Sequence, residues 1–173
     1  MITLALTQRT PLTQVLLVVL GSCIMAMASW ISIPLPFTMI PFTLGPQAPM
    51  LLAILMGPRL AFASVLLFLI EGACGLPVFA LGGSGLPVLL GPRGGYLLSY
   101  LFSTLIVGHL YGTSFSKRLI PLLLAILTTY IFGAIQLSFF TGISQAIALG
   151  VIPFILADVL KCTALATFRM HPR

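Results

Sequence analysis

The chain has 173 residues, of which 60% are hydrophobic and only 6% are charged. Soluble domains carry about 25% charged residues, so this composition leaves too little polar surface to cover a water-facing globule. The net charge is +6, but the basic residues are scattered, whereas nucleic-acid binding requires Lys and Arg clustered on one face. The apolar runs are continuous rather than alternating, which disfavours a membrane β-barrel. An all-α integral membrane protein is the expected class.

The first apolar segment, about Leu12–Trp30, contains an Ala26-Met27-Ala28 sequence that mimics a signal-peptide cleavage site. The segment is longer than the ~7–15 apolar residues of a signal-peptide core. It is close to the length of about 20 residues that a membrane-spanning helix needs. We therefore expect the segment to be retained as the first membrane helix.

Five more helices are expected along the chain, separated mainly by proline and glycine, which interrupt helices. They are about Gln47–Met56, Leu60–Cys74, Tyr96–Tyr111, Leu119–Phe140 and Ala146–Phe168. A Gly- and Pro-rich stretch, Gly75–Gly95, lies between the third and fourth helices. Residues 1–173 are thus expected to form a single membrane domain, a six-helix bundle whose second and third helices are short.

Six crossings place both ends of the chain on the same side of the membrane. With cytoplasmic termini, six of the eight basic residues fall on the inner side, namely Arg9, Arg59, Lys117, Arg118, Arg169 and Arg173. This distribution agrees with the positive-inside rule. The loops expected to face outward are then Ile31–Pro46, Gly75–Gly95 and Thr141–Gln145.

Motifs for catalysis and metal binding are missing from the sequence. The cysteines Cys23, Cys74 and Cys162 are isolated in or beside apolar runs, without the spacing of a zinc or haem site. No G-x-x-x-x-G-K-[ST] motif is present, so the chain has no P-loop with which to hydrolyse ATP. An intramembrane protease needs paired acids or a metal-ligand set, but Glu71 and Asp158 are the only acidic residues. We therefore expect no enzyme activity, no metal and no cofactor.

The last apolar segment contains a charged pair, Asp158 and Lys161, whose spacing of three places both on one face of a helix. A charge at bilayer depth costs at least ~2.5–3.5 kcal/mol on insertion scales. One alternative is a plain intrahelical ion pair, but replacing a buried pair by apolar residues is often neutral or stabilising. We favour a ligand site, because an ammonium group suits an acidic ligand and a carboxylate suits N–H donors.

Four further residues are candidates for the same site. Arg93, at the outer mouth of the fourth helix, is either a headgroup anchor or a second cation facing an acidic ligand. Tyr96 shares a helix face with Tyr100 and is either an interfacial aromatic residue or part of a cavity wall. In the Gly- and Pro-rich stretch, which we expect to be a loop over the cavity, Phe79 offers an apolar wall. The glycines around Ser84 let a ligand approach the main chain.

The first helix contains the small residues Ser22 and Ala26 at a spacing of four. Small residues at this spacing allow another helix to approach closely. The two alternatives are packing within the bundle and docking to another membrane subunit.

Four segments, IPLPFTMIPFTL, GLPVFALGGSG, LLGPRGGYLLSY and PFILADVLK, occur in this order between Ile33 and Lys161. Together they resemble the BioY family, the biotin-binding S components of energy-coupling factor (ECF) transporters. The resemblance implies a six-helix bundle that takes biotin from the outer face for import, with the loop after the first helix closing over the pocket. The D-x-x-K motif of the family falls on Asp158 and Lys161, which the resemblance places among the biotin contacts, with Arg93 beside them.

Biotin, as the transported ligand, carries a carboxylate and a ureido ring with N–H donors. The resemblance implies that Lys161 or Arg93 pairs with the carboxylate and that Asp158 accepts from a ureido N–H; the choice of cation is open. It also implies a bacterial plasma-membrane location and partners, a T subunit and ATPase subunits, with Ser22 and Ala26 as candidate docking residues. The alternative is an S component or small transporter for another acidic vitamin or heterocycle.

Overall fold

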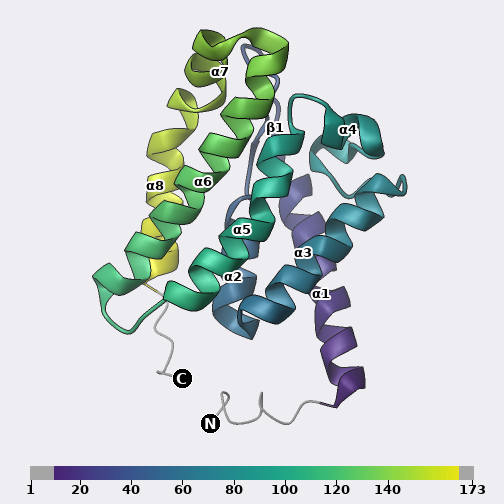
Figure 1. The fold of residues 1–173 in the computed structure, drawn as a ribbon, viewed down its shortest axis with the longest axis vertical. Coiled ribbons are helices and arrows are strands. Elements are labelled where there is room, and N and C mark those ends of the chain that lie inside the picture. The colour runs from purple at the N-terminus through teal and green to yellow at the C-terminus, as the bar shows by residue number, and fades with distance from the viewer. Residues whose placement is uncertain (1–9, 168–173) are drawn as a thin grey trace.

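The computed structural model describes residues 10–167, which are mostly helical (Figure 1). The elements in chain order are α1 Pro11–Trp30, β1 Ser32–Ile33, β2 Phe42–Thr43, α2 Gln47–Met56, α3 Pro58–Ala73, η2 Ala80–Gly82, α4 Leu86–Leu90, α5 Gly94–Leu110, α6 Phe115–Thr141, α7 Ile143–Gly150 and α8 Ile152–Ala166. The expectation of a helical bundle is confirmed, and α1, α2, α3, α5 and α6 lie close to their expected positions.

The connections between helices gather at the two ends of the bundle (Figure 1). One end carries the start of α1, the α2–α3 turn, the α5–α6 connection and the end of α8. The opposite end carries the α6–α7 turn, α4 and the loop between β1 and β2. The antiparallel strands of this loop pair Ser32 with Thr43 and Ile33 with Phe42, so the loop returns to the start of α2 beside the end of α1.

Within residues 10–167, α1 and α6 are each long and apolar enough to span a membrane, and the α7–α8 pair is a third span if its two bent parts count as one. α2 and α5 are apolar but shorter, with 10 and 17 residues. The outer face of α1 exposes large apolar side chains, among them Leu12, Leu16 and Leu20. Such a surface suits contact with lipid rather than with water.

The segment expected as one helix, Ala146–Phe168, is two helices, so this expectation is wrong. α7 and α8 meet at Val151 at an angle of 41°. The cause is Pro153 in the first turn of α8, because proline lacks an N–H and its ring clashes with the carbonyl one turn earlier. Phe168 lies outside the described residues.

Two loops expected to face outward also differ from expectation. The expected loop Thr141–Gln145 is a single residue in the structure, Gly142, because α6 ends at Thr141 and α7 begins at Ile143. Gly142 has a φ of 81°, a conformation that favours glycine. The Gly- and Pro-rich stretch contains the short helices η2 and α4. Gln136 on α6 holds the end of α4 through hydrogen bonds to the carbonyls of Leu89 (2.9 Å) and Gly91 (2.7 Å).

α5 and α6 approach each other closely through small residues. A Cβ atom added at Gly95 would lie 2.2 Å from the carbonyl oxygen of Phe132, and one at Gly133 would lie 2.2 Å from the ring of Tyr96. The Ser99 hydroxyl donates to Thr129 Oγ1 across the same interface at 3.1 Å. Small residues and interhelical hydrogen bonds are typical of helix packing in membranes, and here they fix the face of α5 that carries Tyr96.

The small residues of α1 pack against α3 inside the bundle. Ser22 and Ala26 are buried, Ser22 donates a hydrogen bond to the Glu71 carboxylate, and a Cβ added at Gly21 would lie 2.3 Å from Ser64 Oγ. Of the two alternatives for this motif, the structure supports internal packing. A docking surface made of the Ser22 and Ala26 side chains disagrees with their burial.

Candidate functional site

Asp158 and Lys161 lie on one face of α8, directed into the bundle. Their Oδ1 and Nζ atoms are 3.0 Å apart, and Asp158 is only 5% exposed. The expected pair therefore exists, and it is turned away from the outer surface of the bundle. A buried ion pair is tolerated only when further hydrogen bonds satisfy both partners.

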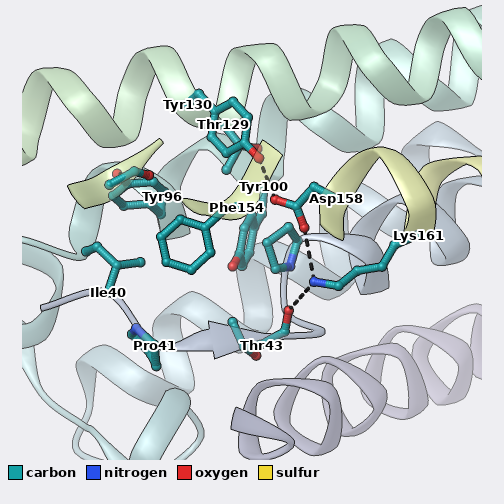
Figure 2. Close-up of a pocket in the computed structure, with 12 residues that line it drawn as sticks. Ile40, Pro41, Thr43, Tyr96, Tyr100, Thr129, Tyr130, Phe154, Asp158 and Lys161 are labelled. Carbon is teal, nitrogen blue, oxygen red and sulfur yellow. Dashed lines mark hydrogen bonds and ion pairs between the residues drawn. The ribbon is translucent and has the colours of Figure 1, made fainter. Parts of the chain in front are cut away.

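Two other helices supply hydrogen bonds to Asp158. Gln47 Nε2, at the start of α2, donates to Oδ1 at 3.1 Å. The Tyr130 hydroxyl on α6 donates to Oδ2 at 2.7 Å (Figure 2). The Oε1 atom of the Gln47 amide is buried without a hydrogen-bond partner. The carboxylate is thus held by donors from three helices, and it keeps acceptor capacity for about one further donor.

The Lys161 ammonium is held by the strand that leads into α2. Nζ donates to the carbonyl oxygen of Thr43 at 3.0 Å (Figure 2) and lies 4.0 Å from the centroid of the Phe42 ring. Cation–π contact of this kind is favourable, and more so away from water. With Asp158 as the third partner, every face of the ammonium is engaged within the protein.

A cavity borders this pair, and we call it the Asp158 chamber (Figure 2). It has about 400 Å³ of space not filled by protein atoms, part of it open to the outside. Four aromatic side chains contribute to its walls, namely Tyr96, Tyr100, Tyr130 and Phe154. The loop between β1 and β2 covers it and adds Ile40 and Pro41 to the lining. An apolar cavity with a few convergent polar groups is the usual form of a small-molecule site.

A second cavity, the Arg93 chamber, adjoins the first. It has about 370 Å³ of unfilled space, and Phe79, Val88, Arg93 and Leu97 contribute to its lining. The two chambers share five lining residues, Ile40, Pro41, Thr43, Tyr96 and Tyr100. The two chambers therefore lie side by side along a shared wall, with the ion pair lining one and the Arg93 guanidinium lining the other, and we call them together the cleft.

Arg93 also contacts the loop that covers the cleft. Its Nε donates to the carbonyl oxygen of Met39 at 2.9 Å. Met39 lies between β1 and β2, next to the lining residues Ile40 and Pro41. Arg93 thus lines the cleft and also binds the loop that covers it.

The structure brings together five of the six residues expected from the sequence. Asp158, Lys161 and Tyr96 line the Asp158 chamber, and Phe79, Arg93 and again Tyr96 line the Arg93 chamber. Ser84 lines neither chamber. The Tyr96 hydroxyl donates to the carbonyl of Gly150 at 2.9 Å, so this tyrosine joins α5 to the end of α7.

Sequence reasoning missed Gln47, Tyr130 and Tyr100 as site residues. Gln47 carried a signal, because it is the one polar side chain in the ten-residue apolar helix α2. Tyr130 and Tyr100 look in sequence like other aromatic residues of membrane helices. Thr43 contributes its backbone carbonyl, for which a side-chain pattern gives no signal.

Acidic residues are not paired in a way that suits catalysis or metal binding. Glu71 lies at the α1–α3 interface with Ser22, and it lines neither chamber. Between residues 10 and 167, no group of three or more His, Cys, Asp or Glu side chains could hold a metal ion.

The chain is similar to known proteins over most of its length. A profile of the BioY family matches residues 4–171. A Lactococcus lactis subsp. cremoris protein named biotin transporter BioY2 is 35% identical over 166 residues, covering 93% of this chain and 90% of that protein. A Pyrococcus horikoshii protein named probable biotin transporter BioY is 38% identical over 122 residues, covering 70% of this chain and 74% of that protein. The crystal structure of the S-component for biotin from an ECF-type ABC transporter matches with a TM-score of 0.79 and 26% identity, covering 92% of this chain and 91% of that one.

Proposed function

The chain belongs to the BioY family, and on this premise we propose that it captures biotin at the outer face of the membrane for uptake. It is a transport protein and not an enzyme. The observation that carries the proposal is the buried Asp158–Lys161 pair beside an aromatic cleft (Figure 2). Biotin offers ureido N–H donors to the carboxylate, an apolar ring system to the aromatic walls, and a carboxylate to a cation.

We assign the biotin carboxylate to Arg93 rather than to Lys161. The Lys161 ammonium already has Asp158, the Thr43 carbonyl and the Phe42 ring as partners. Among residues 10–167, the Arg93 guanidinium uses only Nε, on Met39, and its other N–H groups remain for a bidentate contact with a carboxylate. In this arrangement the ureido ring occupies the Asp158 chamber, and the acidic tail extends into the Arg93 chamber past Phe79.

Thermal unfolding of the purified protein with candidate ligands tests the proposal. A ligand that binds only the folded state stabilises it by about 2.7 kcal/mol at 100 times its dissociation constant. We expect a clear rise in Tm with biotin and a smaller rise with its methyl ester, which lacks the negative charge. The alternative, a carrier of another acidic vitamin or heterocycle, predicts instead that such a compound raises Tm while biotin leaves it unchanged.

We further propose six crossings of the plasma membrane with both termini in the cytoplasm, with α7 and α8 as one bent span. Support comes from the grouping of Arg59 and Lys117 at the same end of the bundle as the start of α1 and the end of α8. Cys74, exposed just after α3, then faces outward. A membrane-impermeant maleimide should label it in intact cells, with Cys74→Ser as the control; labelling only after cell lysis would contradict this orientation.

Import by this chain requires partners, and we propose a membrane-embedded T subunit and ATPase subunits of an ECF module. Support comes from the matched structure, an S-component from an ECF-type ABC transporter, and from the lack of a P-loop motif in this sequence. Radiolabelled biotin uptake in cells deficient in biotin transport is the test. Cells that express the chain together with an ECF module should accumulate biotin faster than cells that express either alone.

A further inference from the structure

Three tyrosines line the Asp158 chamber, and only one has a hydroxyl group without a protein partner. The Tyr96 hydroxyl donates to the Gly150 carbonyl and the Tyr130 hydroxyl donates to Asp158. Tyr100 is 3% exposed, yet its hydroxyl makes no hydrogen bond with any residue between 10 and 167. Buried polar groups almost always have a partner, so the Tyr100 hydroxyl is a candidate contact for a ligand.

The Tyr100 hydroxyl is open to the cleft. Among the described residues, the one fully enclosed side-chain N or O atom without a partner is Gln47 Oε1, so the Tyr100 oxygen is not sealed in the same way. Tyr100 lines both chambers and lies among the lining side chains in Figure 2. A Cβ at Gly45 would lie 2.8 Å from this oxygen, so glycine there leaves room for the phenol.

Asp158 and Tyr100 offer complementary hydrogen-bonding groups to one chamber. Asp158 Oδ2 accepts one hydrogen bond, from Tyr130, and has capacity for another. The Tyr100 hydroxyl can donate. A cyclic urea presents an N–H donor and a carbonyl acceptor on adjacent atoms, so one such ring can satisfy both residues. An anionic group fits the same place poorly, because Asp158 would repel it.

We propose that Tyr100 determines specificity by donating a hydrogen bond to the urea carbonyl of the ligand, while Asp158 accepts from the adjacent N–H. This assignment rests on the proposed function and adds to it a residue that recognises the urea oxygen. It makes the cleft selective for cyclic ureas over rings of the same size that lack a carbonyl acceptor. The acidic tail is recognised separately, by Arg93.

The test compares biotin with 2-iminobiotin, in which a protonated imino nitrogen replaces the urea oxygen and offers donors instead of an acceptor. Binding is titrated calorimetrically at neutral pH with wild-type protein and Tyr100→Phe. The substitution removes one hydroxyl, so it should weaken biotin binding roughly three- to tenfold. It should weaken 2-iminobiotin binding by a smaller factor, because with this ligand the hydroxyl can only accept from the imino group and not donate, so that the preference for biotin narrows.

Tyr96→Phe is the matched control, because its hydroxyl lies in the same chamber but bonds to the protein. It should change the affinities for the two ligands by equal factors. Equal factors for Tyr100→Phe, or no loss of biotin affinity, would overturn the role of Tyr100 while leaving biotin binding intact. Failure of the wild-type protein to bind biotin would instead overturn the proposed function.

Infrared spectroscopy gives a second reading that does not depend on affinity. With biotin carrying carbon-13 at the urea carbon, the carbonyl stretch should lie at lower frequency in the wild-type complex than in the Tyr100→Phe complex, because a donor weakens the C=O bond. The same frequency in both complexes would overturn the assignment.

Discussion

Glu71 and Asp158, the two acidic residues of the chain, both lie between helices and both accept a hydrogen bond from a hydroxyl group, but their surroundings differ. Glu71 accepts from Ser22 at the α1–α3 interface, where small residues such as Gly21 and Ser64 bring the helices together. Asp158 accepts from Gln47, Tyr130 and Lys161 and borders a cavity with aromatic walls.

The comparison shows that a charge in an apolar segment does not by itself identify a binding site. At the α1–α3 interface, small side chains allow close packing, and the acidic group serves to join two helices. Between α5 and α8, the large side chains of Tyr96, Tyr100 and Phe154 line a cavity, and the acidic group borders it. The size of the neighbouring side chains therefore decides which carboxylate is available to a ligand.

The largest effect is expected at the ion pair. Asp158→Asn keeps the shape of the side chain but leaves the Lys161 ammonium, whose side chain is 17% exposed, without a counter-ion, which should lower the free energy of unfolding by up to about 3–5 kcal/mol. Adding Lys161→Met should recover more than half of this loss, because the unpaired charge is gone. Thermal unfolding in detergent measures both. If the loss in free energy of unfolding of the double variant equals the sum of the losses of Asp158→Asn and Lys161→Met alone, the two residues are not coupled as the structure indicates.

A second variant separates packing from binding. Gly133→Ala places a methyl group against the Tyr96 ring, and overpacking of this kind costs about 1–3 kcal/mol. Because Tyr96 is a chamber wall, biotin affinity should fall as well. Gly108→Ala, which meets Pro58 away from the chambers, should lower stability but leave affinity within about twofold. Equal losses of affinity in both variants would contradict the assigned walls.

Substitution of Arg93 should loosen the loop that covers the cleft and so change the rate at which biotin dissociates. Arg93→Gln removes both the contact with Met39 and the cation, so biotin should dissociate about tenfold faster. Arg93→Lys keeps the positive charge but loses the Nε donor that contacts Met39. We expect biotin to dissociate from this variant about threefold faster than from the wild type. A chase of radiolabelled biotin measures the rates. Biotinamide has no carboxylate, so its dissociation rates from Arg93→Gln and Arg93→Lys should differ less than those of biotin. If the two rates differ as much as they do for biotin, Arg93 is not the carboxylate partner.

The smallest effect is expected in the region without a cavity. Ser22→Ala removes one hydrogen bond to Glu71, which should lower the free energy of unfolding by about 0.5–1.5 kcal/mol. Biotin affinity should stay within about twofold. A clear loss of affinity would mean that the α1–α3 interface is coupled to the cleft, and the contrast between the two regions would need revision.

Much of the fold could be predicted because hydropathy and helix-breaking residues are local signals. α1 and α2 match expectation closely. Pro46 and Gly57 mark the two ends of α2, and Gly57 and Pro58 mark the start of α3. The break between α7 and α8 was missed although Pro153 signalled it, because the apolar run continues across the proline. Prolines within long apolar segments thus mark bends that hydropathy alone does not reveal.

The site could be predicted only in part. Asp158 and Lys161 were recognisable because charges are rare in this chain. Their partners were not, because Gln47 and Asp158 are 111 positions apart in sequence, and a polar residue on one helix does not show which helix it will face. The separation of Glu71 from the cavity likewise depends on tertiary packing, which the sequence pattern does not specify.

The most direct measurement is a calorimetric titration of biotin into three proteins, the wild type, Asp158→Asn and Glu71→Gln. Both substitutions replace a carboxylate by an amide of nearly the same shape, the one buried at Asp158 and the one half-buried at Glu71. The account predicts that Asp158→Asn weakens biotin binding by about 30-fold or more, since a charged hydrogen-bonding group is lost, while Glu71→Gln stays within about twofold. Comparable affinities for the two variants, or an Asp158→Asn protein that binds biotin like the wild type, would contradict the placement of the binding site at Asp158.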